Sequence, residues 1–190
     1  MTAPNNSLKF DAAYRAPLTF WGDIRVPKEV KGFAAQHPAA KVLELGCGIG
    51  RFSQYMAEQG LTALGVDFSP VAIMKARART AQKPLRASYL VADVTKLDLP
   101  DRPFDIAFDI GCFHCLNSED QTAYVSGLAC HMRPGATLLL WTMDAAPSGL
   151  VLLPSLVKSV FEEHFCLIKA NKSRRRFAAS HWFWLERRDG

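Results

Sequence analysis

Glu44-Leu45-Gly46-Cys47-Gly48-Ile49-Gly50 decides the fold of this chain, and the apolar pair Val42-Leu43 leads into it. The run predicts a strand that enters a loop with glycine at alternate positions. Without side chains there, a ligand can lie directly against the main chain. A second apolar run, residues 61–66, ends in Asp67, and an acid at the tip of the next strand commonly binds a ribose diol. Together the two features predict a cofactor that contains adenosine.

The glycine spacing excludes two common nucleotide-binding loops. The dinucleotide fingerprint is G-x-G-x-x-G, whereas this chain has Gly46-x-Gly48-x-Gly50. A P-loop requires Gly-Lys-Ser/Thr after its first glycines, and no such triplet follows here. The adenosine is therefore expected to belong to another kind of cofactor.

Residues 44–50 resemble motif I of the class I S-adenosylmethionine-dependent methyltransferases. Four later segments resemble the following motifs of that family in the same order: Gly65–Pro70, Ala92–Val94, Phe104–Asp109 and Met132–Leu140. The resemblance covers Lys41 to Trp141, which is more than half of the chain. It implies the transfer of a methyl group from S-adenosylmethionine.

Apolar runs alternate with helical patterns along most of the chain, which predicts an α/β fold with a doubly wound, mostly parallel sheet. The expected strands are Val42–Leu45, Leu61–Val66, Tyr89–Ala92, Asp105–Asp109 and Thr137–Thr142. The expected helices are Pro27–Gln36, Arg51–Gln59, Pro70–Thr80, Ser118–Met132 and Pro154–Glu163, with N-caps at Ser69 and Ser118. Two closing strands, Phe165–Lys169 and Ala179–Glu186, predict a C-terminal antiparallel hairpin. We expect one domain, 1–190, whose residues 1–27 form an arm over the active site.

The resemblance also implies which residues bind the cofactor. Asp67 would accept from the ribose hydroxyls, Asp93 from the adenine amine, and Glu44 would orient the loop. An isolated Asp after a strand is also a common N-cap, so each carboxylate has a purely structural alternative. The full expected set is Glu44, Gly46, Cys47, Gly48, Gly50, Asp67, Phe68, Asp93, Val94, Asp109 and Trp21.

The segment Asp109-Ile-Gly-Cys-Phe-His-Cys115 resembles a segment of small bacterial methyltransferases related to the thiol and thiopurine enzymes. His114 could take a proton from the acceptor, or it could only bridge a carbonyl and the cofactor. We name His114 and Asp109 as the catalytic candidates. The acceptor would contact Tyr14, Trp21, Cys112, Phe113 and His114, and Trp141 could add to this wall. Sulfur or a ring nitrogen is the favoured target, with oxygen left open.

Cys112 and Cys115 form a single C-x-x-C pair, and no second pair stands at the spacing of a zinc site, so no metal is expected. The chain has 190 residues, five cysteines and no apolar run long enough to span a membrane. The odd cysteine number and apolar surroundings favour buried thiols in a reducing compartment. We therefore expect a cytoplasmic monomer or homodimer with no membrane partner.

The net charge of +5 comes from 23 basic and 18 acidic residues. Residues 169–190 contain seven of the basic and two of the acidic ones, so the rest of the chain has sixteen of each and is neutral. A basic hairpin can attract anionic partners, or it can be a solvated face. A nucleic-acid methyltransferase is the alternative, but no Asn/Asp-Pro-Pro-Tyr element follows the fourth strand, so nucleic acid is unlikely as a partner. A non-catalytic binding module is a further alternative, which the intact loop and its acids disfavour.

Overall fold

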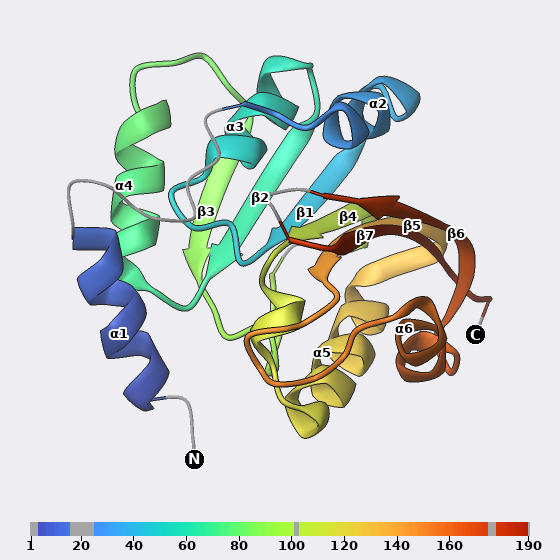
Figure 1. Ribbon diagram of the computed structural model, residues 1–190. Coiled ribbons are helices and arrows are strands. Elements are labelled where there is room, and N and C mark those ends of the chain that lie inside the picture. Colours follow the sequence, from blue (N-terminus) through green and yellow to red (C-terminus); the bar gives the residue numbers. More distant parts are fainter. Residues whose placement is uncertain (1–3, 16–24, 101–102, 175–177, 190) are drawn as a thin grey trace.

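The computed structural model describes residues 4–15, 25–100, 103–174 and 178–189, and a seven-stranded sheet forms their centre. The strand order is β3-β2-β1-β4-β5-β7-β6 (Figure 1). The strands are β1 (Lys41–Leu45), β2 (Thr62–Asp67), β3 (Ala87–Val91), β4 (Phe104–Ile110), β5 (Met132–Met143), β6 (Phe165–Ser173) and β7 (Ser180–Arg187).

Strands β1 to β5 pair in parallel, whereas β7 is antiparallel to both β5 and β6. From β1 the chain adds β2 and β3 on one side of the sheet, and it then returns to add β4 and β5 on the other side of β1. The strand order therefore reverses between β1 and β4, whose carboxyl ends lie next to each other. Ligands of open α/β sheets bind at such a point. The predicted fold class, with its C-terminal antiparallel hairpin, is confirmed.

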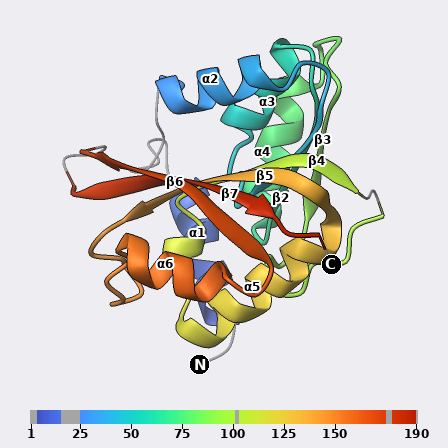
Figure 2. The same cartoon turned by 90° about the vertical axis from the view of Figure 1, so that its right-hand side faces the viewer.

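Helices cover both faces of the sheet (Figure 2). Helices α2, α3 and α4 lie on one face, and α5 and α6 lie on the other. Their bounds are α2 (Lys28–Gln36), α3 (Arg51–Glu58), α4 (Pro70–Thr80), α5 (Ser118–His131) and α6 (Pro154–Phe161), with a short 3-10 turn η1 (Phe113–Cys115) after β4. With helices on both sides, β4 buries five of its seven residues, as expected for a central parallel strand.

Two predicted helix caps have different outcomes. Ser69 caps α4, because its Oγ accepts a hydrogen bond from Ala72 N at 3.1 Å. The prediction that Ser118 caps α5 is wrong. The cap is Asn117, whose Oδ1 accepts from Asp120 N at 2.9 Å, and Ser118 is already the first helical residue. An N-cap side chain must reach the N–H three residues ahead, and the asparagine amide does so here.

The helix α1 (Pro4–Arg15) was not predicted. It lies beside α4, on the side of the molecule where the strands of the parallel part end (Figure 1). Ser69 Oγ donates to Asp11 Oδ1, and Lys75 Nζ donates to the carbonyl oxygen of Tyr14. Among the described residues, no helix is long and apolar enough to cross a membrane.

Candidate functional site

The glycine loop leaves β1 and enters α3 with three residues in the left-handed region. Gly46, Gly48 and Gly50 have φ angles of +65°, +52° and +71°. At Gly46 an added Cβ would lie 2.4 Å from Cys112 Cβ, and at Gly48 it would lie 2.9 Å from the Tyr14 hydroxyl. The bare loop therefore accepts close contact from α1 on one side and from the turn after β4 on the other.

Asp67 ends β2 and is buried beside this loop. Its Oδ2 accepts from Gly48 N at 2.9 Å, and its Oδ1 accepts from Ser69 N at 2.9 Å. Burial raises the pKa of this carboxyl group, and the two backbone donors oppose that shift. A carboxylate has about four lone-pair sites, so two remain for a ligand.

Asp93 follows β3 and is half-buried. Its Oδ1 accepts from Thr95 N at 2.9 Å and from Thr95 Oγ1 at 2.7 Å. Both bonds go to Oδ1, so neither uses the lone pairs of Oδ2. The next residue, Val94, is buried among the apolar side chains that pack under α5.

Glu44 lies on β1, directly before the glycine loop, and is buried. Its Oε2 accepts from Ser53 N at 2.8 Å and also from Ser53 Oγ. Burial raises the pKa of Glu44 to about 8, and the nearby Asp109 and Asp67 carboxyl groups add to the shift. Glu44 thus connects the strand before the loop to the first turn of α3.

Asp109, at the carboxyl end of β4, is fully buried and accepts four hydrogen bonds. Its Oδ1 accepts from Gly111 N at 3.0 Å and Cys112 N at 2.8 Å. Its Oδ2 accepts from Phe113 N at 2.9 Å and from the Tyr124 hydroxyl at 3.0 Å. These donors use all of its lone-pair sites. Burial nevertheless raises its pKa to about 6.

His114 lies in the turn η1, and its ring is buried against Trp141, with 5.4 Å between the ring centroids. Its Nδ1 accepts a hydrogen bond from Met143 N at 3.1 Å. Because a backbone N–H can only donate, Nδ1 is the unprotonated nitrogen, and the neutral ring carries its proton on Nε2. In this state His114 is a hydrogen-bond donor through Nε2.

The structure separates the remaining predicted residues. Cys112 packs against Gly46, at the loop, whereas Phe113 is fully buried against Tyr124 and Phe161. Cys47 is buried, and its side chain packs against Gly65 while its Sγ donates to the carbonyl oxygen of Gly48 at 3.6 Å. Burial raises the pKa of the Cys47 and Cys112 thiols, so both stay protonated.

The N-terminal residues predicted to contact the ligands are described only in part. Tyr14 is buried with its hydroxyl over Gly48, so it meets the glycine loop. Phe10 packs edge-on against Phe68, with 5.4 Å between the ring centroids. Trp21 lies outside the described residues.

Some residues of the site carried no signal in the sequence. Asp11 and Lys75 fix α1 to α4, and Tyr124 binds Asp109 from α5. His181 Nδ1 lies 2.7 Å from Asp144 Oδ1, which joins β7 to the end of β5. Asp144 directly follows the fifth strand, and this place after a strand is the only signal that could have singled it out. In the described part of the chain, no three His, Cys, Asp or Glu side chains are grouped to hold a metal ion.

Comparisons with known proteins agree on one family. A family model described as "Methyltransferase domain" matches residues 42–135. The 2-heptyl-1-hydroxyquinolin-4(1H)-one methyltransferase of Mycobacteroides abscessus is 32% identical over 106 residues, which cover 55% of this chain and 47% of that protein. The chain spans less than two thirds of the length of the curated relatives that it matches.

Two solved structures resemble the chain over almost its whole length. One is described as "Conversion of a Disulfide Bond into a Thioacetal Group during Echinomycin Biosynthesis", with 25% identity, a TM-score of 0.79 and coverage of 97% of this chain and 92% of that chain. The other is the Burkholderia thailandensis 1,6-didemethyltoxoflavin-N1-methyltransferase with its substrate and S-adenosylhomocysteine bound. It has 19% identity and a TM-score of 0.81, and the match covers 100% of this chain and 92% of that chain. At 19% identity, the likeness to the second structure shows a shared fold and nothing more.

Proposed function

Because the chain belongs to the class I S-adenosylmethionine-dependent methyltransferases, with residues 42–135 as its methyltransferase domain, we propose that it methylates a small-molecule acceptor. The observation that carries the proposal is the glycine loop with Asp67 and Asp93 at neighbouring strand ends. Both carboxylates keep lone pairs after their internal hydrogen bonds are counted.

The donor and acceptor groups of the site fit the proposed cofactor. Asp67 would accept from the ribose hydroxyls with its two remaining lone-pair sites, and Asp93 would accept from the adenine amine with Oδ2. The bare backbone of Gly46 and Gly48 allows close approach, and Tyr14 would close the loop from above. The Asp67 carboxyl group beside the loop would favour a ligand that carries positive charge.

When bound, S-adenosylmethionine supplies a methyl group that leaves its sulfonium with the bonding electron pair kept by that sulfur, while an acceptor lone pair forms the new bond. The chain's own contribution is to hold the two partners in line and to exclude water. Neither task requires a charged residue at the reacting atoms.

Asp109 and His114 take roles that differ from a simple acid–base pair. Asp109 would be a positioning residue, because its four internal donors leave no lone pair for a ligand. It holds the turn that carries Cys112 and His114. His114 would contact the acceptor or cofactor through Nε2–H, because its Nδ1 lone pair is used by Met143 N.

A small acceptor is supported by the relatives. One relative is named for a hydroxyquinolinone substrate, and one solved structure holds 1,6-didemethyltoxoflavin. We propose a flat heteroaromatic or thiol acceptor for this chain, methylated at sulfur or a ring nitrogen. Screening small thiols, N-heterocycles and phenols for release of S-adenosylhomocysteine tests this part of the proposal.

The cofactor site is tested by Asp67→Asn. The substitution keeps the shape of the side chain but removes the charge that strengthens its bonds to hydroxyl groups. We expect S-adenosylhomocysteine to bind more weakly by about 1–3 kcal/mol in isothermal titration calorimetry. The exposed Glu163→Gln serves as the control and should bind normally. Equal affinities for Asp67→Asn and the unsubstituted chain would remove Asp67 from the site.

A further inference from the structure

Two cysteines enclose the short turn η1 that follows β4, and both are present as thiols. Cys112 is the N-cap of η1 and Cys115 is its last residue, and Cys115 N donates to the carbonyl oxygen of Cys112 at 2.9 Å. Residues i and i+3 of a 3-10 turn lie above one another at a rise of about 2.0 Å per residue, so their Cα atoms are about 6 Å apart. Disulfides join Cα atoms that are about 4.4–6.8 Å apart. The backbone of the turn therefore permits a bond between these two residues.

The side chain of Cys115 points back along the turn towards Cys112. Its Sγ donates to the carbonyl oxygen of Gly111 at 3.6 Å, and Gly111 directly precedes Cys112. The sulfur of Cys115 is thus beside the peptide bond that joins Gly111 to Cys112. A change in the rotamer of Cys112 would bring the two sulfur atoms together.

The two thiols differ in their access to solvent. Cys115 is exposed, whereas the Cys112 side chain packs on Gly46, where an added Cβ would lie 2.8 Å from Cys112 Sγ. Burial raises the pKa of the Cys112 thiol, and the Asp109 carboxyl group adds to the shift. A shielded, protonated thiol reacts slowly with dissolved oxidants, so Cys115 is the thiol that an oxidant meets first.

A peroxide can oxidise the pair in two balanced steps. The Cys115 sulfur attacks one oxygen of hydrogen peroxide, the O–O bond breaks, and the products are a sulfenic acid and water. The Cys112 sulfur then attacks the sulfenic sulfur, the S–O bond breaks, and a second water leaves with the Cys112 proton. The two sulfur atoms together lose two electrons, which the peroxide accepts. Cys112 is protonated at the start, but its place beside Cys115 gives it a high effective concentration for the second step.

Closing this disulfide would move the Cys112 side chain off the glycine loop. The backbone of the turn is held by Asp109, which accepts from Cys112 N at 2.8 Å and from Phe113 N at 2.9 Å. Because the backbone is fixed there, Cys112 Sγ has to leave Gly46 in order to reach Cys115. Gly46, in the left-handed region at φ +65°, would then lose the side chain that packs on it. We therefore expect the loop to bind the cofactor less well in the oxidised chain.

Each of the other three cysteines lies elsewhere in the described chain. Cys47 packs its sulfur against Gly65, Cys130 is exposed on α5, and Cys166 is on β6. In the same described residues, no three His, Cys, Asp or Glu side chains are grouped to hold a metal ion. The pair around η1 is therefore better explained by thiol chemistry than by metal binding.

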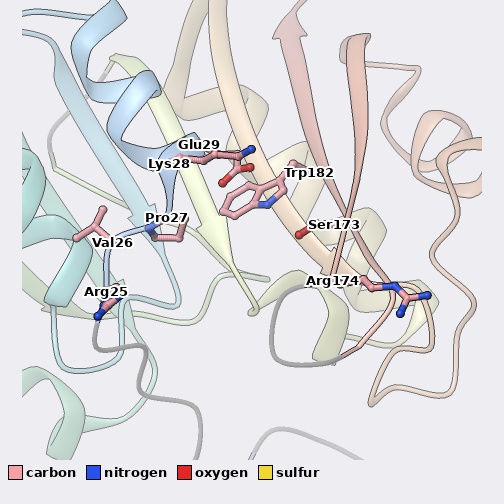
Figure 3. A pocket seen from close by; sticks show the side chains of 8 residues that line it. All are labelled: Arg25, Val26, Pro27, Lys28, Glu29, Ser173, Arg174 and Trp182. Carbon is pink, nitrogen blue, oxygen red and sulfur yellow. The ribbon is translucent and has the colours of Figure 1, made fainter.

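A hollow of about 410 Å³ between the start of α2 and the β6–β7 hairpin is separate from η1 (Figure 3). Trp182 lines this hollow, and the buried rings of Trp182 and Trp141 lie between it and His114. A ligand in the hollow would therefore not touch η1, and the oxidation of the cysteine pair should not depend on it.

We propose that Cys112 and Cys115 form a reversible disulfide in the presence of a peroxide, and that this bond weakens cofactor binding at the glycine loop. The second half rests on the proposed function and adds regulation to its cofactor site. Transient disulfides that sense oxidants are compatible with a reducing compartment.

The test treats the full chain with hydrogen peroxide, alkylates the remaining thiols and maps the cysteines by mass spectrometry. We expect a disulfide between Cys112 and Cys115 that dithiothreitol removes. Isothermal titration calorimetry then compares the reduced and oxidised chains. The oxidised chain should bind S-adenosylhomocysteine about threefold or more weakly, and dithiothreitol should restore the affinity.

Two serine variants provide the controls. Cys115→Ser removes the thiol that reacts first and keeps a hydroxyl group that can donate to Gly111 O. It should bind S-adenosylhomocysteine normally when reduced, and peroxide should not change that affinity. Cys130→Ser removes another exposed thiol, on α5, and should respond to peroxide as the unsubstituted chain does.

Four results would overturn the inference. They are oxidation of Cys115 to a sulfinic acid without a disulfide, a disulfide between Cys112 and Cys47 instead, a Cys112–Cys115 disulfide that leaves the affinity unchanged, and an equal loss of affinity in Cys115→Ser. If the reduced chain does not bind S-adenosylhomocysteine, the proposed function fails, whereas the disulfide can still be mapped. The two failures are therefore distinguishable.

Discussion

At the scale of single residues, counting hydrogen bonds separates side chains that the sequence treats alike. Asp67, Asp93 and Asp109 all follow strands, and the sequence gives each a ligand-binding role. In the structure Asp109 accepts four bonds, whereas Asp67 and Asp93 accept two each. Three of the four donors to Asp109 are its own turn's N–H groups, whose direction depends on a backbone conformation that the sequence does not reveal.

The proposed donor role of His114 can be tested with two substitutions. His114→Gln retains an N–H near the position of Nε2, whereas His114→Ala removes it. We expect His114→Ala to lower kcat about tenfold or more, whereas His114→Gln should keep most of the kcat of the unsubstituted chain. The measurements are steady-state kinetics and the affinity for S-adenosylhomocysteine, which should change little in either variant. If Gln is as slow as Ala, and both recover with an acceptor that is already ionised, His114 acts as a base instead.

Glu44 makes folding stability depend on pH. Its pKa is raised from 4.5 to about 8 in the folded chain, so the folded state holds a proton that the unfolded state releases. This contribution to stability is complete below pH 4.5 and declines as the pH rises towards 8. Each pKa unit corresponds to about 1.4 kcal/mol, so the decline should exceed about 1 kcal/mol.

Glu44→Gln removes this titration, and the neutral side chain can still accept from Ser53 N. Urea unfolding at pH 5 and pH 8 should show that Glu44→Gln gains stability relative to the unsubstituted chain as the pH rises. Asp67 and Asp109 also titrate, but they do so in both proteins. Parallel stability curves for the two proteins would contradict the assigned cause.

At the scale of elements, the sequence predicts the sheet and its helices well because apolar periodicity and glycine placement fix them locally. The helix Pro70–Thr80 is correct to the residue, since Ser69 caps it and Pro70 begins it. The strand β5 begins five residues earlier than predicted. Met132 pairs with Phe104 ahead of a register shift, and this pairing depends on the neighbouring strand.

The helix α1 shows what the sequence could not predict. Short helices gain most of their stability from tertiary packing, so propensity alone is a weak guide. The described contacts of α1 are with residues far along the chain, among them Gly48, Phe68 and Lys75. The aromatic arm was expected to lie over the active site, and Tyr14, which was expected to contact the acceptor, lies over the glycine loop.

At the scale of the whole molecule, one edge of the sheet carries two different surfaces. Helix α1 covers the end with the glycine loop and Asp67, and a hollow of about 410 Å³ opens at the other end, between the start of α2 and the β6–β7 hairpin. His114 lies between them through its contact with Trp141. The proposed cofactor site therefore lies at one end of this edge, away from the β6–β7 hairpin.

Hydrogen exchange followed by mass spectrometry tests this separation. S-adenosylhomocysteine should slow exchange in residues 4–15 and 46–50, because α1 and the glycine loop would be held against it. The hairpin residues 165–174 should be little affected. Asp67→Asn, which weakens the first ligand, should lower the protection of α1 and of the loop together, because Asp67 Oδ2 accepts from Gly48 N and Ser69 connects it to Asp11. If S-adenosylhomocysteine slows exchange in the hairpin and not in α1, the cofactor does not bind at the end of the sheet that α1 covers.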